Sequence, residues 1–232
     1  MPLDSECTLI LGDCIEKMKD IPNNSIDLIL TDVPYGLSKD MQNDSISGLE
    51  EMLTLAFKEF KRVSKKKHSI LIFFDAGKNL PIAFKAIDRA GLFFERYINF
   101  YKPNDCSMPH CRVLRKSEAL LLCSEGGVLN HDGDEYMHDS IKANHCEKDK
   151  SFYHPSVKDL GLVEKLIRVN TKRGEVVLDA FMGSGTTGVG CMHCGRRFIG
   201  IELDKRYYDI AEKRIVSSQK QSKLYSVGNG YE

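Results

Sequence analysis

Apolar runs of strand length alternate along the chain with segments whose apolar residues recur at helical spacing. Runs that predict strands lie at residues 7–11, 27–31, 69–74, 93–101, 118–123, 175–181 and 197–202. Segments that predict helices lie at 14–19, 49–63, 80–90, 157–169 and 205–216. Such alternation predicts an α/β fold with a mostly parallel sheet covered by helices on both faces. We expect 93–101 and 118–123 to form an antiparallel pair at the sheet edge.

The chain is long enough for one α/β domain with a substantial core, because its 232 residues fall within the usual size of a single domain. We expect this domain to span residues 1–218, with a small insertion at about 102–153 and a flexible tail at 219–232. Residues 126–153 are polar with little periodicity, and residues 38–47 form a second polar segment that we expect to be mobile.

An acidic and aromatic motif closes the strand predicted at 27–31. Asp32-Val33-Pro34-Tyr35-Gly36 predicts a sharp loop after a buried strand. Pro34 restricts Val33 to an extended conformation and so aims the Val33 carbonyl. Asp32 and that carbonyl can each accept one hydrogen of an exocyclic amine, and Tyr35 can stack on the ring that carries it. Proline loops at strand ends are also common without such a role, so the motif alone leaves both interpretations open.

A glycine-rich motif follows the strand predicted at 175–181. In Met182-Gly183-Ser184-Gly185-Thr186-Thr187-Gly188, glycines allow a ligand to approach the backbone. The helix that begins here offers unpaired N–H groups to a carboxylate or phosphate. The next strand ends in Glu202, where dinucleotide-type folds bind a ribose diol.

The spacing of Gly183, Gly185 and Gly188 also satisfies the fingerprint of NAD-binding loops, which is a weak signal by itself. The first motif decides between the alternatives, because a hydride-transfer enzyme has no evident use for an amine clamp. S-adenosylmethionine with a nucleobase acceptor fits the two motifs better than an NAD-dependent oxidoreductase.

Together the motifs resemble those of DNA amino-methyltransferases, in the permuted group whose catalytic motif precedes the cofactor motif. The family's catalytic signature is Asp-Pro-Pro-Tyr or Ser-Pro-Pro-Tyr, and Asp32 to Tyr35 match it with one change. Its cofactor signature is similar to residues 179–187. Flanking matches at 12–14, 24–28, 154–158 and 196–202 extend the resemblance over nearly the whole chain, except the middle and the tail.

The resemblance implies a Rossmann-like fold that binds S-adenosylmethionine, with double-stranded DNA as substrate. The catalytic residues it implies are Asp32, Val33, Pro34 and Tyr35. The cofactor-binding residues it implies are Asp13, His154, Ser156, Lys158, Asp179, Phe181, Gly183, Ser184, Gly185, Thr186, Thr187 and Glu202. By resemblance, segment 154–158 closes over the methionine end of the cofactor. Lys158 would then start the helix at 157–169, where an ordinary solvated helix residue is the alternative. Segment 38–47 would act as a lid over the target base.

Val33 departs from the family pattern, because it replaces the first proline of the usual pair. Asp32 therefore loses the restriction that a following proline imposes. Pro34 still constrains the Val33 carbonyl, so we expect the clamp to be retained, with room for altered substrate preference or reduced activity. Asp159 is a smaller departure, at a position where the family often has a second proline.

The chemistry these residues predict is direct methyl transfer to the exocyclic amine of a base flipped out of the duplex. Cytosine C5 methylation would need a thiol, typically in a Pro-Cys dipeptide, and the chain contains none. By resemblance, aspartate at the first motif position is more typical of adenine enzymes and serine of cytosine enzymes. We therefore expect transfer to adenine N6, with cytosine N4 and a catalytically weakened DNA-binding homologue as alternatives.

A formal net charge of +0 means that contacts with DNA phosphates must come from local patches. We expect Arg112, Arg115 and Lys116 to supply them, because they lie in the insertion where the family reads its DNA sequence. The basic run 58–67 is the next candidate, although a solvated helix end explains it as well. The insertion is short, so the recognition site is short or another subunit assists. The resemblance allows a homodimer and a cognate restriction endonuclease as partners.

The remaining composition is that of an ordinary globular protein, with 42% hydrophobic and 28% charged residues. We find no apolar stretch of membrane-spanning length and no signal-peptide pattern, so we expect a cytoplasmic protein whose 8 cysteines are mostly reduced. The spacing of Cys106, His110, Cys111, His145 and Cys146 matches no standard zinc module, and we expect no metal. Residues 191–194 are expected to pack in a helix.

Overall fold

The computed structural model describes residues 5–35, 46–102, 116–125, 136–142 and 158–228, with the side chains of 46, 47 and 221–228 left out. Several predicted features lie outside these ranges. They are His154, Ser156, Arg112, Arg115, the cysteines and histidines considered for zinc, and nearly all of the segment 38–47.

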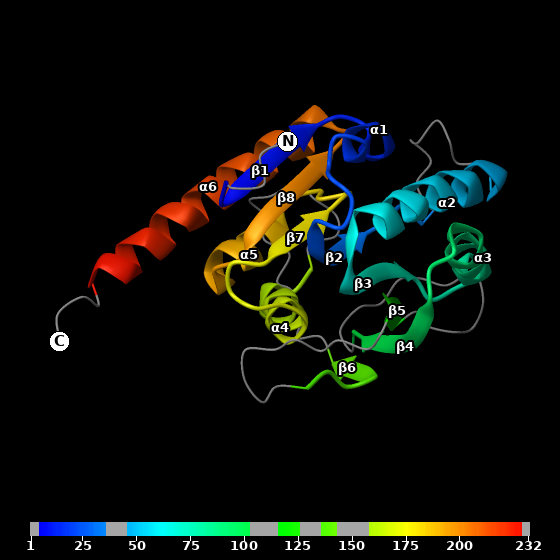
Figure 1. The fold of residues 1–232 in the computed structure, drawn as a ribbon. Coiled ribbons are helices and arrows are strands. Elements are labelled where there is room, and N and C mark those ends of the chain that lie inside the picture. Colours follow the sequence, from blue (N-terminus) through cyan, green and yellow to red (C-terminus); the bar gives the residue numbers. More distant parts are fainter. Residues whose placement is uncertain (1–4, 36–45, 103–115, 126–135, 143–157, 229–232) are drawn as a thin grey trace.

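Within the described ranges, eight strands form one sheet (Figure 1). They are β1 (Cys7–Leu11), β2 (Ile26–Asp32), β3 (Ser64–Asp75), β4 (Phe94–Tyr101), β5 (Ser117–Ser124), β6 (Ser140–Lys142), β7 (Val176–Asp179) and β8 (Arg197–Glu202). Their order across the sheet is β1-β8-β7-β2-β3-β5-β4-β6. Strand β5 is antiparallel to both of its neighbours, and all other pairs are parallel. The predicted sheet, mostly parallel with an antiparallel pair, is confirmed.

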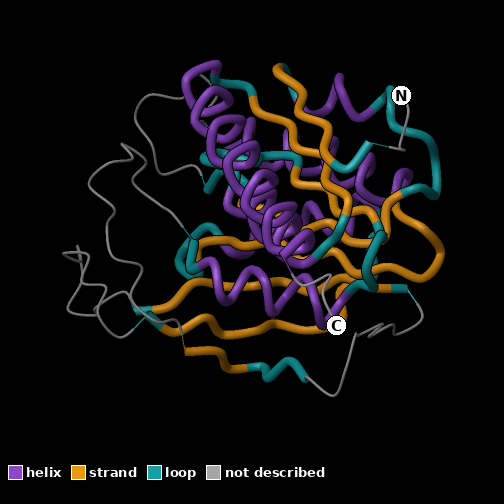
Figure 2. Tube along the Cα trace, turned by 90° about the vertical axis from the view of Figure 1, so that its left-hand side faces the viewer, coloured by secondary structure: helices purple, strands orange, loops and turns teal. Residues whose placement is uncertain are grey.

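Helices cover both faces of the sheet (Figures 1 and 2). Helices α1 (Cys14–Met18), α2 (Ile46–Val63) and α3 (Leu80–Ala90) pack on one face, and α4 (Leu160–Asn170), α5 (Thr186–Cys194) and α6 (Lys205–Gly228) on the other. Side chains alternate between the faces of a strand. In β3, Ile70 and Ile72 therefore join the core under α1–α3, whereas Leu71 and Phe73 join the core under α4–α6. None of the described helices combines the length and apolar composition needed to cross a bilayer.

Three predictions about the strands were wrong. Strand β3 begins at Ser64 rather than Ser69, because Ser64 pairs with Ile26 of β2 and draws the basic residues 65–67 into the strand. The antiparallel pair of β4 and β5 does not form the edge. Strand β6, which lies in the polar segment 126–153 and was not predicted, pairs with β4 and becomes the edge strand. Its three residues are too few to show a period of two.

Three helix boundaries also differ from the prediction by more than one residue. Helix α2 begins at Ile46 rather than at 49. Helix α4 begins at Leu160, and Asp159 is its N-cap, accepting a hydrogen bond from the Leu162 N–H at 3.1 Å. Lys158 therefore precedes the helix instead of starting it. Helix α6 continues to Gly228 and not to Val216, so much of the predicted tail is helical. Polar residues dominate this last part, and polarity alone does not end a helix.

The loop predicted to be catalytic (residues 32–35, the catalytic loop) and the glycine-rich loop (residues 182–188) meet at the centre of the sheet, because they follow the adjacent strands β2 and β7. After β2 the chain continues to β3 on one side, and after β7 it continues to β8 on the other. This reversal is the topological switch point where open α/β sheets bind ligands. The predicted proximity of the two loops is confirmed.

Cysteines in the described residues are free thiols, and Cys191 and Cys194 are buried in α5 as predicted for packing residues. Among the same residues, no three His, Cys, Asp or Glu side chains gather as a metal ion would require.

Candidate active site

The catalytic loop leaves the sheet at Asp32 and is held by packing on its core side. Val33 is only 2% exposed and joins the core under α1–α3. The Tyr35 ring packs edge-on against Phe74 of β3, with centroids 5.4 Å apart. The Asn79 side-chain amide donates a hydrogen bond to the Tyr35 carbonyl at 2.7 Å. Packing of Val33 thus holds the loop where the family usually has a proline.

Both oxygens of the Asp32 carboxylate have a partner. The Tyr35 hydroxyl donates a hydrogen bond to Oδ1, and the Lys158 ammonium lies 2.9 Å from Oδ2. Burial, followed by the negative charges of Asp32 and Glu118, raises the pKa of Tyr35 well above its ordinary value, so this hydroxyl remains a donor. Each carboxylate oxygen has two acceptor sites. Asp32 therefore keeps acceptor capacity for a substrate amine; stacking of a base on Tyr35 stays a prediction.

Lys158 is a buried part of this site, not a solvated helix residue. Its side chain is 8% exposed, and its Nζ lies 2.8 Å from Glu118 Oε2 as well as 2.9 Å from Asp32. The Lys102 ammonium binds the other oxygen of Glu118. Sequence analysis missed Lys102 and Glu118. The one signal in the sequence was the acidic residue directly before the apolar run 119–122. Glu118 lies near Asp32 only because β5 is antiparallel to β3, and the sequence does not show the direction of a strand.

The glycine-rich loop is tied to the catalytic strand by Asp179, the last residue of β7. Asp179 Oδ1 accepts hydrogen bonds from the Thr31 hydroxyl at 2.7 Å and from the Phe181 N–H at 3.2 Å. Burial raises the pKa of Asp179 to about 6, although hydrogen bonds from Thr187 and Thr31 partly oppose this rise. The carboxylate thus joins β2 to the loop after β7.

Replacement of Asp179 by asparagine is expected to remove one pH-dependent part of the free energy of unfolding. Because the folded pKa is raised from 3.8 to about 6, folding is favoured by the protonated form, and this stabilisation is lost as the pH rises through 6. Between pH 5 and 7.5 wild type should lose about 1.4 kcal/mol relative to Asp179→Asn. Urea unfolding of both proteins at each pH measures this difference; a constant difference would contradict the assignment.

A cavity of about 110 Å³ opens between the two loops. Asp32 lines it with seven of the predicted cofactor residues, Lys158, Asp179, Phe181, Gly183, Ser184, Thr186 and Thr187. Helix α5 begins here, and its N-cap is Gly185, which has no side chain to cap the first N–H groups of the helix. The cavity therefore combines a helix N-terminus, which favours an anionic group, with the carboxylate of the catalytic loop.

Glu202 lies beside the glycine-rich loop at the end of β8. Its Oε2 accepts a hydrogen bond from the Gly183 N–H at 2.9 Å, and its Oε1 accepts one from the Asp204 N–H at 2.8 Å. Burial raises the pKa of Glu202, although these backbone hydrogen bonds lower it. The remaining acceptor sites of its oxygens suit the hydroxyls of a ribose.

Asp13 lies near Glu202 but has another use. The Gly12 N–H donates a hydrogen bond to the Glu202 carbonyl at 2.8 Å, which joins the ends of β1 and β8. The Asp13 carboxylate caps α1 by accepting hydrogen bonds from Ile15 N and Glu16 N. Its contribution to cofactor binding stays a prediction.

Two glycines of the motif serve helix packing, a cause that the sequence analysis did not identify. Gly185 has a φ of 80°, and a Cβ there would lie 2.8 Å from the Ala211 Cβ of α6. A Cβ at Gly188 would lie 2.4 Å from Ile215 Cδ1. Arg214, also on α6, donates hydrogen bonds to the carbonyl and hydroxyl oxygens of Ser184 at 2.5 and 2.9 Å. Helix α6 thus supports the loop from behind.

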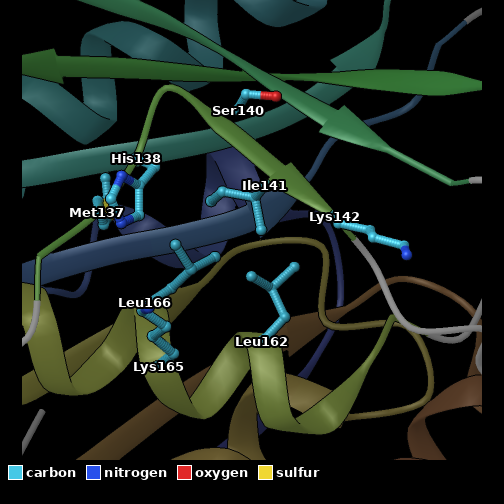
Figure 3. A pocket seen from close by; sticks show the side chains of 8 residues that line it. All are labelled: Met137, His138, Ser140, Ile141, Lys142, Leu162, Lys165 and Leu166. Atoms are coloured by element: carbon cyan, nitrogen blue, oxygen red, sulfur yellow. The ribbon is translucent and has the colours of Figure 1, made fainter.

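A larger cavity of about 210 Å³ lies between β6 and α4 (Figure 3). Leu162 and Leu166 of α4 face Ile141 of β6 across it, and Lys142 and Lys165 lie at its margin. No residue of either motif lines it. We therefore place the candidate active site in the smaller cavity.

Lys116 and Lys65, described residues of the two predicted DNA-binding segments, lie at opposite ends of the strands. Lys116 is half-buried at the start of β5, and its carbonyl accepts a hydrogen bond from Lys102 N at 2.7 Å. Asp32, the last residue of β2, lies at the same end of the strands. Lys65 lies at the opposite end, where its ammonium is 2.6 Å from the carboxylate of Asp27 at the beginning of β2. Of these two lysines, Lys116 is on the side of the candidate active site.

The sequence pattern of a family of DNA methylases, which act on exocyclic amines at N6 or N4, matches residues 26–213. The chain belongs to this family of DNA amino-methyltransferases. It is 30% identical over 252 residues to the Type II methyltransferase M.HinfI of Haemophilus influenzae, covering 90% of this chain and 68% of that protein. It is 26% identical over 242 residues to the DNA adenine methyltransferase YhdJ of Escherichia coli (strain K12), covering 90% and 82%.

Solved structures show the same fold. The PvuII DNA methyltransferase, which is cytosine-N4-specific, superposes with a TM-score of 0.77 at 18% identity over 94% of this chain and 93% of that one. M1.HpyAVI in complex with S-adenosylmethionine superposes with a TM-score of 0.67 at 26% identity over 90% and 99%. The cofactor of this family is S-adenosylmethionine. The Glu202 carboxylate and the open N-terminus of α5 fit its ribose and its methionine carboxylate.

Proposed function

We propose that the protein methylates the N6 amine of adenine in double-stranded DNA, using S-adenosylmethionine. The observation that carries the proposal is the carboxylate of Asp32 at the rim of the cofactor cavity, at the motif position where serine is more typical of cytosine enzymes. The similarity to YhdJ, which is named as an adenine methyltransferase, also supports adenine as the target base. The likeness to the PvuII enzyme, at 18% identity, supports the fold alone.

Positioning of the amine is the main task of the chain's own residues in this reaction. Bound S-adenosylmethionine supplies a methyl group on a sulfonium, which is already a strong electrophile. Asp32 accepts one amine hydrogen and the Val33 carbonyl accepts the other, which turns the nitrogen lone pair toward the cofactor cavity. The proton that the amine releases after transfer leaves along its hydrogen bond to Asp32 and passes to water.

Product analysis tests the proposed base. The purified protein is incubated with methyl-labelled S-adenosylmethionine and duplex DNA, and the DNA is digested to nucleosides for mass spectrometry. We expect label in N6-methyl-2′-deoxyadenosine. Label in N4-methyl-2′-deoxycytidine would overturn the adenine assignment, and DNA that binds but acquires no label would indicate the catalytically weakened homologue.

DNA affinity is expected to depend on a few cations, because the chain has no net positive charge. Alanine at Arg112, Arg115 or Lys116 should weaken binding. Loss of a base contact costs about 1–3 kcal/mol and changes sequence preference, whereas loss of a phosphate contact weakens binding to all sequences alike and lowers the salt dependence. Titrations with cognate and scrambled duplexes at several salt concentrations separate these roles. Lys213→Ala, an exposed change on α6, is the control. Unchanged binding in all three variants would place the DNA surface elsewhere.

Association with DNA as part of a Type II restriction–modification system is a further element of the proposal, supported by the likeness to M.HinfI. A homodimer would let two small recognition insertions act on one site, and the stoichiometry of the DNA complex measures it.

A further inference from the structure

Four charged side chains form a continuous chain of ion pairs behind the catalytic loop, in the order Lys102, Glu118, Lys158 and Asp32. Lys102 and Lys158 bind opposite oxygens of Glu118, and Lys158 also binds Asp32. Charges alternate along this chain, so it is neutral as a whole. Of its four members, only Asp32 and Lys158 belong to segments that resemble the family's motifs.

Strand direction brings these residues together. Because β5 is antiparallel to β3, its first residues lie at the edge where the parallel strands end, and Glu118 pairs with Asp75, the last residue of β3. Strand β4 ends at Tyr101, directly before Lys102. Asp32 pairs with Phe73 one strand away. Glu118 thus reaches the catalytic edge from a strand that carries neither motif.

Lys158 is the centre of the chain. An ammonium with 8% exposure is unfavourable unless opposite charges compensate the loss of water. Two carboxylates do so within 2.9 Å, and the Phe73 ring lies with its centroid 4.7 Å from Nζ. Burial alone would lower the pKa of Lys158, but Asp32 and Glu118 raise it above its ordinary value. Burial would raise the pKa of Glu118, but the positive charges of Lys158 and Lys102 lower it below its ordinary value.

We propose that Glu118 is a positioning residue for methyl transfer, which holds the Lys158 ammonium between two carboxylates so that Asp32 keeps one orientation and one charge state toward the base amine. The proposal rests on the proposed function in requiring transfer to an exocyclic amine, but it holds for adenine and cytosine alike. In this proposal the Lys158 ammonium forms ion pairs with Asp32 and Glu118, and it does not bind the methionine carboxylate of the cofactor.

Two variants test the chain, with a matched control. In Glu118→Gln the ammonium loses one partner, so kcat should fall about tenfold and its alkaline limb should move to lower pH. In Lys158→Met the Asp32 carboxylate loses its cation, so kcat should fall further and the alkaline limb should be lost, because no ammonium remains to be deprotonated. Lys158→Arg should restore part of the rate, because it keeps the charge. Glu125→Gln, the same change just past the other end of β5, should leave both limbs unchanged.

Cofactor affinity is measured on the same proteins by calorimetry, and thermal unfolding shows that each variant is folded at the assay temperature. We expect unchanged S-adenosylmethionine affinity in Glu118→Gln and Lys158→Met. Tyr35, Asp75 and Asp179 also face the site and are the same in every variant, so a difference between pH profiles reports the ion-pair chain. A lower kcat without any shift of either limb would indicate a merely structural effect and overturn the proposal.

Outcomes for the base and for the positioning residue are distinguishable. Labelled N4-methyl-2′-deoxycytidine from wild type together with shifted pH limbs in the variants would overturn the adenine assignment and support the role of Glu118. Labelled N6-methyl-2′-deoxyadenosine together with wild-type kinetics in Glu118→Gln would support the adenine assignment and overturn the role of Glu118. A weaker cofactor affinity in Lys158→Met with unchanged kcat would assign Lys158 to the cofactor and overturn the positioning proposal.

Discussion

Replacement of Asp32 by alanine is expected to lower the rate of methyl transfer about 100- to 1,000-fold, with little change in the affinity for S-adenosylmethionine. The carboxylate is the group of the catalytic loop that can accept an amine hydrogen with a full negative charge, and loss of one oriented electrostatic partner has effects of this size. Asp32 contacts Tyr35 and Lys158, whereas Glu202 contacts the backbone N–H groups of Gly183 and Asp204. The variant should therefore lose the rate of methyl transfer while it keeps its affinity for S-adenosylmethionine.

Single-turnover assays with labelled cofactor measure the rate, and calorimetry measures the affinity. Asp32→Asn keeps the shape of the side chain and removes its charge, so it should be nearly as slow. Asp88→Ala, an exposed change on α3, is the control. A wild-type rate in Asp32→Ala would show that the amine is not bound at this carboxylate.

Replacement of Glu202 by alanine is expected to weaken the binding of S-adenosylmethionine about 10- to 100-fold. The expected loss is that of hydrogen bonds between a charged carboxylate and the ribose hydroxyls, at about 1.5–3 kcal/mol each, of which solvent recovers a part. Glu202 also accepts the Gly183 N–H, so its removal loosens the glycine-rich loop. Gly183→Val should act in the same direction, because Gly183 has a φ of 51°, a conformation unfavourable for a β-branched residue.

Glu202→Gln separates the two effects, because its side-chain oxygen can still accept the Gly183 N–H while the charge is lost. Glu212→Ala, an exposed change on α6, is the control. Equal affinity of wild type, Glu202→Ala and Gly183→Val in calorimetry would be incompatible with a ribose site at the end of β8.

Much of the architecture was predictable because it depends on short stretches of chain. The boundaries of α3 and β8 agree with the apolar spacing at 80–90 and 197–202. The loops after β2 and β7 follow from proline and glycine at the ends of apolar runs. Where the prediction was wrong, as at β6 and at the start of β3, pairing with a neighbouring strand decided the structure, and pairing is not visible in a local window.

The amino-acid sequence by itself determined the two motifs, their order, and hence the chemistry of an amine clamp beside a nucleoside pocket. Only the tertiary structure decided which other groups meet Asp32. Lys158, which lies directly before α4, is the ion-pair partner of Asp32, and Glu118 meets Lys158 at this end of the strands because β5 runs antiparallel to β3. The raised pKa of Asp179 and the burial of Val33 were likewise decided by packing, because loss of water depends on everything that surrounds a side chain and not on its neighbours in sequence.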